Sequence, residues 1–330
     1  MKKKILKIIL GLAVPLIVLL AAAAIYLFIA KPPAVTPAYG VTWSKTYAEY
    51  LGINAQDGLR AALDDLGIKK FRLPVYWTEV EPRAGQFDFS WLSKQLDLIA
   101  SRGGQAILVV GAKQPRWPEC WIPDWAAALS KADRETVQAA YVQKVVDTFK
   151  KHPAVFAWQV ENEALFAFGT CKEQSKAMTL KEIALVKQTD THPVFTTESG
   201  EWSTWLTFAK QTDAIGISIY RTIYTPYLGL VTYPFPARFY ANKAHLFSYW
   251  IKKVYVSEFQ MEPWVEEGLT SITADEQAKR FSQQEMWDSL QYAKQTGFES
   301  VYFWGAEWWY WMKVKGNHPE YWQTVKDFLR

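Results

Sequence analysis

Two predicted strands end in glutamates that could work together on one substrate. The apolar run 154–160 is followed by three polar residues that include Asn162 and Glu163, and the run 253–257 is followed by Glu258. A buried strand cannot continue through carboxylates without a large desolvation cost, so we expect both strands to end at the edge of a cavity. A protonated and an ionised carboxyl group in one cavity form the arrangement that cleaves glycosidic bonds.

The elements around these two strands predict one (β/α)8 barrel. From residue 38 onward, β-rich runs alternate with amphipathic stretches, and runs such as 106–110 are apolar enough to be buried on both faces. The predicted strands are 38–43, 69–75, 105–111, 154–161, 194–197, 214–219, 253–257 and 300–304. The predicted helices are 55–66, 91–101, 134–151, 175–189, 203–210, 236–250, 274–296 and 321–329. A doubly wound sheet is less favoured, because the chain has no Gly-rich phosphate loop.

Polar and aromatic residues gather where this barrel would have its active site. Barrel enzymes build their sites from the C-terminal ends of the strands and the loops that follow. In this order the chain places there Arg72, Tyr76, Trp77, Glu79, Gln114, Arg116, Trp117, Trp121, Trp125, Asn162, Glu163, Glu198, Tyr220, Glu258, Trp304, Glu307 and Trp308. With 17 Trp in the chain, we expect about half to serve the core and others to stack against sugar rings.

The expected mechanism uses Glu163 and Glu258 in different roles. Asn162 could hydrogen-bond a sugar hydroxyl, and Tyr220 could donate to Glu258 and keep it ionised. The fourth and seventh strands lie across the barrel mouth, which allows the carboxyl separation of about 5–5.5 Å that a retaining mechanism uses. Glu161 alternates with Glu163 along the strand, and we expect it to make a structural hydrogen bond to a neighbouring strand.

Three segments give the chain a family resemblance. Residues 158–163 (WQVENE) resemble the acid/base strand of clan A glycoside hydrolases, the 4/7 superfamily, and are most similar to families 35 and 42. Residues 77–89 resemble the segment after strand two in those families and in families 5 and 39, and 257–264 are similar to the nucleophile strand end. The resemblance implies a (β/α)8 hydrolase with Glu163 as acid/base and Glu258 as nucleophile. It places Arg72, Asn162, Tyr220 and Trp304 around the sugar, and Trp77, Trp117, Trp121 and Glu262 are further candidates for substrate binding.

Two positions depart from this pattern or leave a choice open. Ser218 stands where family 5 enzymes commonly carry a histidine before the strand-six tyrosine, which argues against family 5. Glu262 follows Glu258 by four residues and is the alternative nucleophile. We prefer Glu258, because it directly follows the apolar strand.

The N-terminus predicts a transmembrane helix. Residues 8–30 carry no charge, and as a helix they would span roughly 34 Å, enough for a hydrocarbon core of about 30 Å. Lysines in the stub 1–7 predict a cytoplasmic N-terminus, with a Pro-rich linker at 31–37 and an exported catalytic domain at 38–330. The partner of residues 8–30 would be a lipid bilayer. A cleaved signal peptide and a secreted enzyme are the alternative.

Composition narrows the remaining possibilities. The net charge of +4 includes five lysines up to Lys31, so the rest of the chain carries −1 and has no basic stripe for nucleic acid. The four histidines fall outside the predicted strand ends, so we expect no metal and no cofactor. Cys120 and Cys171 would lie on neighbouring loops and could form a disulfide, with free thiols as the alternative.

Two other activities remain open beside hydrolysis of an oligo- or polysaccharide. A transglycosylase that remodels surface glycans would use the same residues with an acceptor sugar in place of water. A tethered carbohydrate-binding barrel that has lost catalysis is the third reading, and the presence of both Glu163 and Glu258 argues against it. The sequence predicts neither the sugar specificity nor the oligomeric state.

Overall fold

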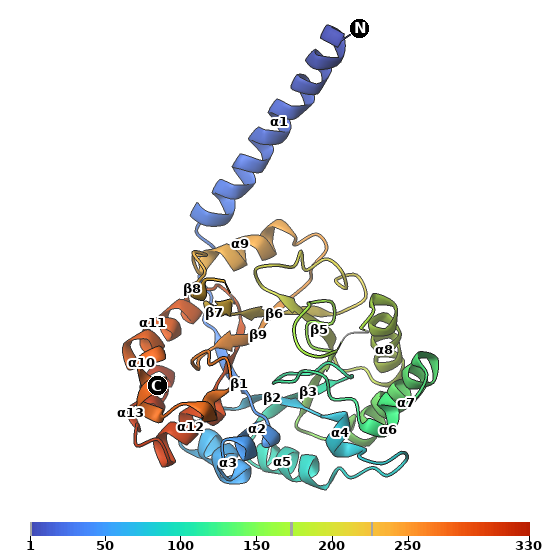
Figure 1. Cartoon of the computed structure of the whole chain (residues 1–330), viewed down its shortest axis with the longest axis vertical. Coiled ribbons are helices and arrows are strands. Elements are labelled where there is room, and N and C mark those ends of the chain that lie inside the picture. The colour runs from blue at the N-terminus through green and yellow to red at the C-terminus, as the bar shows by residue number, and fades with distance from the viewer. Residues whose placement is uncertain (1, 172–173, 226) are drawn as a thin grey trace.

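The computed structural model confirms the predicted (β/α)8 barrel. It describes residues 2–171, 174–225 and 227–330, with the side chains of 2–12 outside the description. Eight parallel strands close in the order β1-β10-β9-β6-β5-β4-β3-β2 (Figure 1). They are β1 (Ala38–Thr42), β2 (Lys70–Pro74), β3 (Gln105–Val110), β4 (Val155–Val160), β5 (Val194–Ser199), β6 (Ala214–Ile219), β9 (Val254–Gln260) and β10 (Ser300–Trp304). A separate antiparallel hairpin is formed by β7 (Thr222–Thr225) and β8 (Gly229–Thr232).

Helices surround the barrel and cover its outer face (Figure 1). The longer ones are α3 (Ala55–Asp64), α5 (Ser90–Ala100), α7 (Lys131–Phe149), α8 (Lys176–Thr189), α9 (Arg238–Leu246), α11 (Gln283–Lys294), α12 (Ala306–Val314) and α13 (Glu320–Leu329). Shorter turns of helix are α2 (Lys45–Tyr50), α4 (Trp77–Val80), α6 (Asp124–Ala127), the 3₁₀ turn η1 (Leu269–Ser271) and α10 (Ala274–Arg280). The apolar strands are buried because helices cover their outer face while side chains fill the barrel.

The N-terminal end of the barrel is packed with apolar and aromatic side chains. Tyr255 and Tyr302 lie there in one buried cluster with Phe195, and the Tyr255 and Phe195 rings stand edge to face at 5.3 Å. Gly40 on β1 makes room for Tyr302, because a Cβ there would lie 2.7 Å from the tyrosine ring. The N-terminal end of the barrel is therefore filled by side chains, and polar side chains lie toward the C-terminal end.

Three predicted elements differ from the structure. Residues 203–210 form bends and turns instead of a helix, because side chains and backbone of this segment bind Glu198 and close a compact loop. The predicted helix 274–296 is two helices, since Ser282 starts α11 with a capping box of its own. Strand β9 continues to Gln260, so Glu258 lies inside the strand and does not follow its end. Helix α12 was not predicted.

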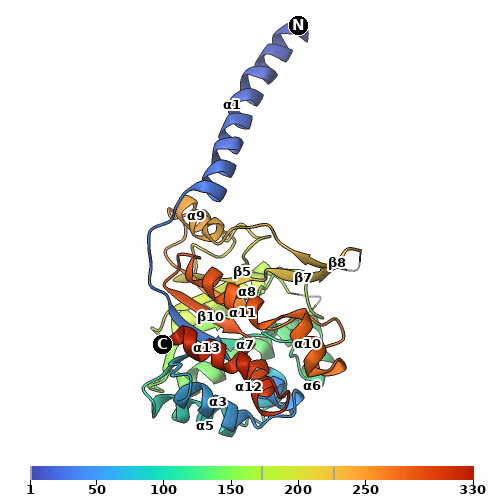
Figure 2. The same ribbon diagram turned by 90° about the vertical axis from the view of Figure 1, so that its left-hand side faces the viewer.

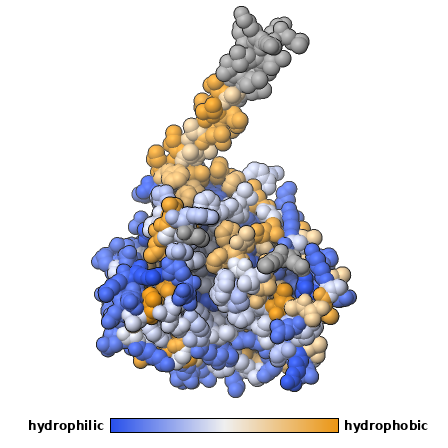
Figure 3. Space-filling view, in the orientation of Figure 1, coloured by the Kyte–Doolittle hydropathy of each residue, from blue (hydrophilic) through white to orange (hydrophobic). Residues whose placement is uncertain are grey.

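The N-terminal helix α1 (Lys2–Ile29) leaves the molecule beside α9 (Figures 1 and 2). Its described side chains from Val14 onward are mostly apolar and exposed, as Figure 3 shows. Within the described residues, no helix has both the length and the hydropathy needed to cross a membrane. The predicted span 8–30 includes residues 8–12, whose side chains lie outside the described part of the chain.

The last turn of α1 is fastened to the barrel by α9. The buried Asn242 amide donates to the carbonyls of Tyr26, Leu27 and Ala30 at 3.1, 3.1 and 2.8 Å. Phe28 packs against Phe239 with ring centroids 5.4 Å apart. The Tyr26 carbonyl also accepts from the Ala30 N–H at 3.1 Å, whereas the carbonyls of Leu27 and Ala30 lie where a helix end leaves such groups without intrahelical partners, so the barrel caps α1 there.

Replacing Asn242 by alanine should loosen this end of α1. Loss of a buried donor to three carbonyls costs about 1–3 kcal/mol, so amide exchange of residues 26–30 should speed up roughly tenfold or more. Hydrogen exchange with mass spectrometry on the detergent-solubilised full chain measures this. Asn54→Ala, which removes the N-cap of α3, should change exchange in α3 but not in α1. Unchanged exchange of residues 26–30 in Asn242→Ala would contradict the capping role.

Candidate active site

The turn after β4 directs the predicted catalytic residues into the barrel mouth. Glu161 and Glu163 both adopt positive φ, +57° and +45°, which few residues other than glycine do. Glu163 is held there by its backbone N–H, which donates to the Thr197 hydroxyl at 2.8 Å. The strained turn therefore aims successive side chains in different directions, and the surrounding hydrogen bonds maintain it.

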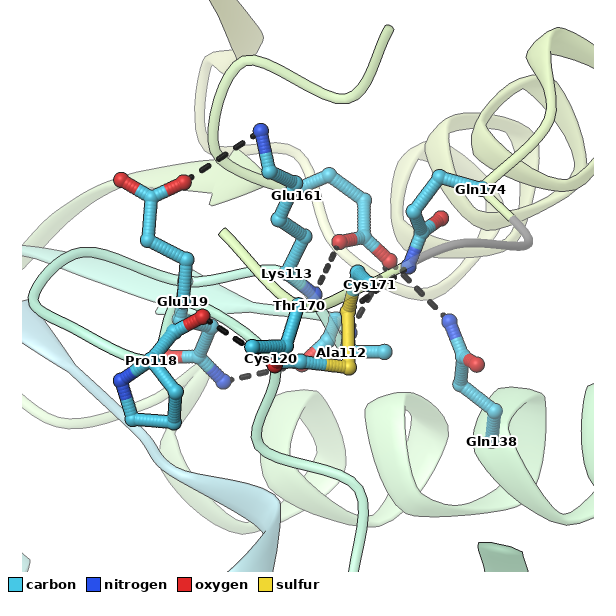
Figure 4. Close-up of a disulfide and its surroundings, with 12 residues drawn as sticks. Ala112, Lys113, Pro118, Glu119, Cys120, Gln138, Glu161, Thr170, Cys171 and Gln174 are labelled. Carbon is cyan, nitrogen blue, oxygen red and sulfur yellow. Dashed lines mark hydrogen bonds and ion pairs between the residues drawn. A yellow bond between two sulfur atoms is a disulfide. The ribbon is translucent and has the colours of Figure 1, made fainter. Parts of the chain in front are cut away.

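Glu161 faces away from the mouth and fastens the end of β3, as we expected. Its carboxylate accepts from the backbone N–H groups of Ala112 and Lys113 at 2.9 and 2.5 Å and from the Gln138 amide at 3.0 Å. Figure 4 shows it between these three groups. Burial raises the pKa of Glu161, and the two backbone donors oppose that rise. Glu161 is thus a structural carboxylate.

Arg72 is the centre of a buried polar network in the barrel. It is fully buried on β2 and donates to Gln159 at 2.7 Å and to Asn162 at 2.7 Å. It also forms an ion pair with Glu258, with Nη1 2.9 Å from Oε1. The network thus ties strands β2, β4 and β9 together below the mouth.

Glu258 is held as an acceptor of two hydrogen bonds. Besides Arg72 on Oε1, the Tyr220 hydroxyl donates to Oε2 at 2.8 Å, as we expected. These two bonds fix the orientation of the carboxylate. Glu258 pairs with Ser218 of β6, where a register shift in the ladder marks a local irregularity. Its place inside β9 corrects the expected strand end at 257.

Glu163 sits in the opposite electrostatic situation. Burial and the nearby negative charge of Glu258 raise its pKa to about 7, while the positive charge of Lys113 opposes the rise. The Lys113 ammonium donates to the backbone carbonyls of Glu163 and Phe166 at 2.9 and 3.0 Å. The two carboxyl groups are therefore close enough to influence each other, and their environments push them toward different protonation states.

Asn162 keeps one donor free beside these carboxyl groups. Its oxygen accepts from Arg72 and from the Thr197 hydroxyl at 2.7 and 3.0 Å, which fixes the orientation of the amide. Its buried nitrogen has no hydrogen-bond partner among the described residues. An unsatisfied buried donor is costly, so this N–H₂ is an exception among the buried polar groups of the barrel.

A second ionic cluster lies at the mouth around Arg116. This buried arginine forms ion pairs with Glu262 and with Glu307, the latter at 2.7 Å, and its guanidinium stacks 4.0 Å from the Trp304 ring. The Trp304 indole N–H donates to Glu262 at 2.8 Å. One Glu262 oxygen is buried and unpaired within the described structure. One oxygen of Glu262 therefore binds both Arg116 and Trp304, and the other oxygen is an acceptor without a partner among the described residues.

The candidate tryptophans do not all reach the mouth. Trp77 is fully buried and stacks on Tyr141 at 5.2 Å, so we correct its assignment to substrate binding. Trp77 lies at the start of α4, and its side chain points into the core and not toward the mouth. Trp121 stacks on Tyr76 at 3.7 Å and is half-buried, and Trp117 is 68% exposed. Trp117 and Trp121 therefore remain candidates beside Trp304.

Three residues of the site were missed in the sequence. Thr197 and Lys113 bind the backbone of Glu163, and Gln159 accepts from Arg72. Gln159 and Thr197 lie on predicted strands in which alternate side chains face into the barrel, and this alternation could have indicated both residues. Lys113 follows β3 in a loop, and nothing in its sequence context indicates that its ammonium reaches residues 50 positions away.

A disulfide joins the loops after β3 and β4. Cys120 and Cys171 have Cα atoms 4.9 Å apart, and the bond lies next to Thr170 and Pro118 (Figure 4). The Thr170 N–H also donates to the Pro118 carbonyl at 3.0 Å. Because Glu163 lies in the second loop, which begins at Glu161, the bridge restrains the segment that follows Glu163.

Known proteins resemble the chain in sequence and fold. A family model described as beta-galactosidase, glycoside hydrolase family 42, matches residues 60–141. The beta-galactosidase Bga of Halorubrum lacusprofundi is 29% identical over 124 residues, which cover 31% of this chain and 17% of that protein.

The solved structures that resemble the chain share its fold. GH5_18 from Bifidobacterium longum superposes with a TM-score of 0.58 at 13% identity, covering 82% of this chain and 69% of that one. The beta-galactosidase from H. lacusprofundi gives a TM-score of 0.54 at 14% identity, covering 80% and 52%. The chain thus resembles clan A glycoside hydrolases, family 42 among them, and its sequence matches span a small part of the curated relatives.

The raised pKa of Glu163 predicts how stability changes with pH. The folded protein holds this proton up to about pH 7, whereas an unfolded glutamate releases it near 4.5, so folding loses stability as pH rises through this window. Glu163→Gln removes that loss. The variant should match the wild type at pH 5 and exceed it by ~2 kcal/mol at pH 8.

Urea unfolding at the two pH values measures the difference. Glu267→Gln serves as the control, because Glu267 is exposed and should show no pH-dependent gain. The assignment fails when Glu163→Gln changes stability equally at both pH values.

Proposed function

We propose that this chain is a retaining β-glycosidase in which Glu163 is the acid/base and Glu258 the nucleophile. The observation that carries the proposal is the contrast between the two carboxyl groups. Glu258 accepts from Arg72 and Tyr220, whereas burial and Glu258 itself raise the pKa of Glu163 to about 7. One group is thus ready to attack and the other to give a proton near neutral pH.

The reaction proceeds in two displacements. Glu258 attacks the anomeric carbon while the glycosidic C–O bond breaks, and Glu163 gives its proton to the leaving oxygen. Formation of the ester removes the charge of Glu258, which lowers the repulsion that held the proton on Glu163. Glu163 can then take a proton from water, which attacks the anomeric carbon and frees Glu258.

The sugar would lie between the catalytic pair and the Arg116 cluster. The free Asn162 N–H₂ is a donor for a hydroxyl next to the anomeric carbon, and the unpaired Glu262 oxygen is an acceptor for another hydroxyl. Trp304 supplies an aromatic face beside them. Since the curated relatives are named beta-galactosidases, we propose β-galactosides as the first substrates to test.

Azide distinguishes the two glutamates. Glu258→Gly should lose at least about 10⁴-fold of the turnover of an aryl β-galactoside and recover part of it with azide, because the small anion enters from the face of the missing nucleophile. The product should be the α-glycosyl azide. Glu163→Gly with azide should give the β-azide instead, since Glu258 still forms the covalent intermediate. NMR of the products measures both.

Glu262 provides the control for this assignment. Glu262→Gly removes a partner of Arg116 and Trp304 and should weaken substrate binding without azide rescue. Formation of the α-azide by Glu262→Gly in place of Glu258→Gly would reverse the choice of nucleophile.

We further propose that residues 8–30 anchor the enzyme in a lipid bilayer, with the N-terminus cytoplasmic and the barrel outside. The support is the uncharged run in the sequence and the exposed apolar side chains along α1, such as Ile17 and Leu19 at 64% and 66%. A disulfide is also typical of proteins outside the cytosol. Secretion after signal cleavage is the alternative.

Alkaline carbonate extraction tests the anchor. The full chain, expressed with its own N-terminus, should stay in the membrane pellet, because about 20 apolar residues hold a protein in the bilayer against high pH. Replacing Leu19 and Leu20 by lysine should release it into the supernatant. A full-length chain found in the supernatant would argue against a membrane span, and a shortened chain there would indicate cleavage.

A further inference from the structure

Four aromatic side chains form a continuous row from the catalytic centre to the rim of the mouth. The row begins at Tyr220, which donates to Glu258, and passes to Trp264 with ring centroids 6.2 Å apart. Trp264 contacts Phe168 at 6.0 Å, and Phe168 contacts Trp117 at 6.1 Å. Exposure increases along it, from the half-buried Trp264 to Phe168 at 36% and Trp117 at 68%.

The outer half of this row is fixed before any ligand binds. Phe168 and Trp117 lie on the two loops that the disulfide Cys120–Cys171 joins. Between them, Gly169 has a positive φ of +81° and approaches so closely that a Cβ would lie 2.7 Å from the Glu119 Cβ. Exposed aromatic rings on ordinary loops would collapse or vary, but here two covalently joined loops hold them in place.

The position of Phe168 tells which part of a substrate it would meet. Phe168 lies in the loop after β4 that contains Glu163, and Lys113 holds this loop through the carbonyls of Glu163 and Phe166. A general acid lies beside the leaving oxygen, so the group that departs extends toward the loop of the acid. The sugar that reacts occupies the other side, near Asn162 and Arg72.

We propose that Phe168, Trp117 and Trp264 form a binding site for the leaving-group side of an oligosaccharide. The rings stand edge to face at 66° and 60°, so sugars would pack against the exposed face of each ring in turn, and we call these rings, two of them on the disulfide-joined loops, the aromatic platform. The proposal rests on the catalytic roles given above to Glu163 and Glu258. Aromatic faces suit the C–H faces of pyranose rings, and their exposed edges leave the sugar hydroxyls in water. The substrate class is therefore an oligosaccharide with sugar on both sides of the cleaved bond, in preference to a glycoside with a small leaving group.

Two substrates separate the platform from the catalytic centre. β-Galactotriose places sugar on the platform, whereas β-galactosyl fluoride has a leaving group too small to reach it. Trp117→Ala and Phe168→Ala should each lower kcat/KM for the trisaccharide about tenfold, mainly through KM, and change that for the fluoride by less than about twofold. The exposed Trp117 can be removed without affecting the core. Tyr249→Ala, which removes a ring that is 88% exposed and follows α9, should leave both values unchanged.

Calorimetric binding of galactotriose to Glu258→Gln gives a readout that does not depend on turnover, because this variant lacks the proposed nucleophile. Adding Trp117→Ala to Glu258→Gln should weaken binding about tenfold. Equal loss for both substrates, or unchanged binding when Trp117→Ala and Phe168→Ala are added to Glu258→Gln, would overturn the platform. A wild type that binds galactotriose through Trp117 but turns over neither substrate would overturn the catalytic proposal and leave the platform standing.

Discussion

A single buried guanidinium connects the elements on which the candidate site depends. Arg72 reaches Glu258, Gln159 and Asn162 from the inside of the barrel, where no water is needed to satisfy it. Breaking a buried ion pair by removing one partner typically costs 3–5 kcal/mol, since the other charge is left without compensation. The arrangement therefore links stability to the candidate site, because the group that orients Glu258, the proposed nucleophile, also joins three strands of the barrel. The Tyr220 hydroxyl, the Asn162 amide and the Thr197 hydroxyl complete the same network.

The carboxyl groups gain their different properties from this arrangement. Glu258 has a cation and a hydroxyl on its two oxygens, while Glu163 has burial and a neighbouring anion. Glu161 differs from both, because two backbone N–H groups and an amide consume its hydrogen-bonding capacity. Glu258 is thus an oriented carboxylate, Glu163 is protonated more easily, and Glu161 has a structural role.

The sequence predicted the features that follow from local pattern. Alternating apolar runs and helical stretches were sufficient for the barrel, and polar residues at the ends of such runs indicated Glu163, Asn162 and Glu258. What it could not predict depends on contacts between distant segments. Trp77 has the sequence context of a mouth residue, but its ring packs on Tyr141 of α7. The local sequence predicts a helix at 203–210, whereas hydrogen bonds to Glu198 fold this segment into a loop, and such tertiary contacts leave no local pattern.

The attachment of α1 through Asn242 has a consequence for approach to the mouth. Figures 1 and 2 show α1 leaving from the outer wall of the barrel at α9, and not from either rim. Asn242 and Phe239 of α9 hold the last turn of α1, so the helix is joined to the barrel by side-chain contacts as well as by the backbone of residues 31–37. If α1 is held in a bilayer as proposed, these contacts also set the direction in which the barrel mouth faces.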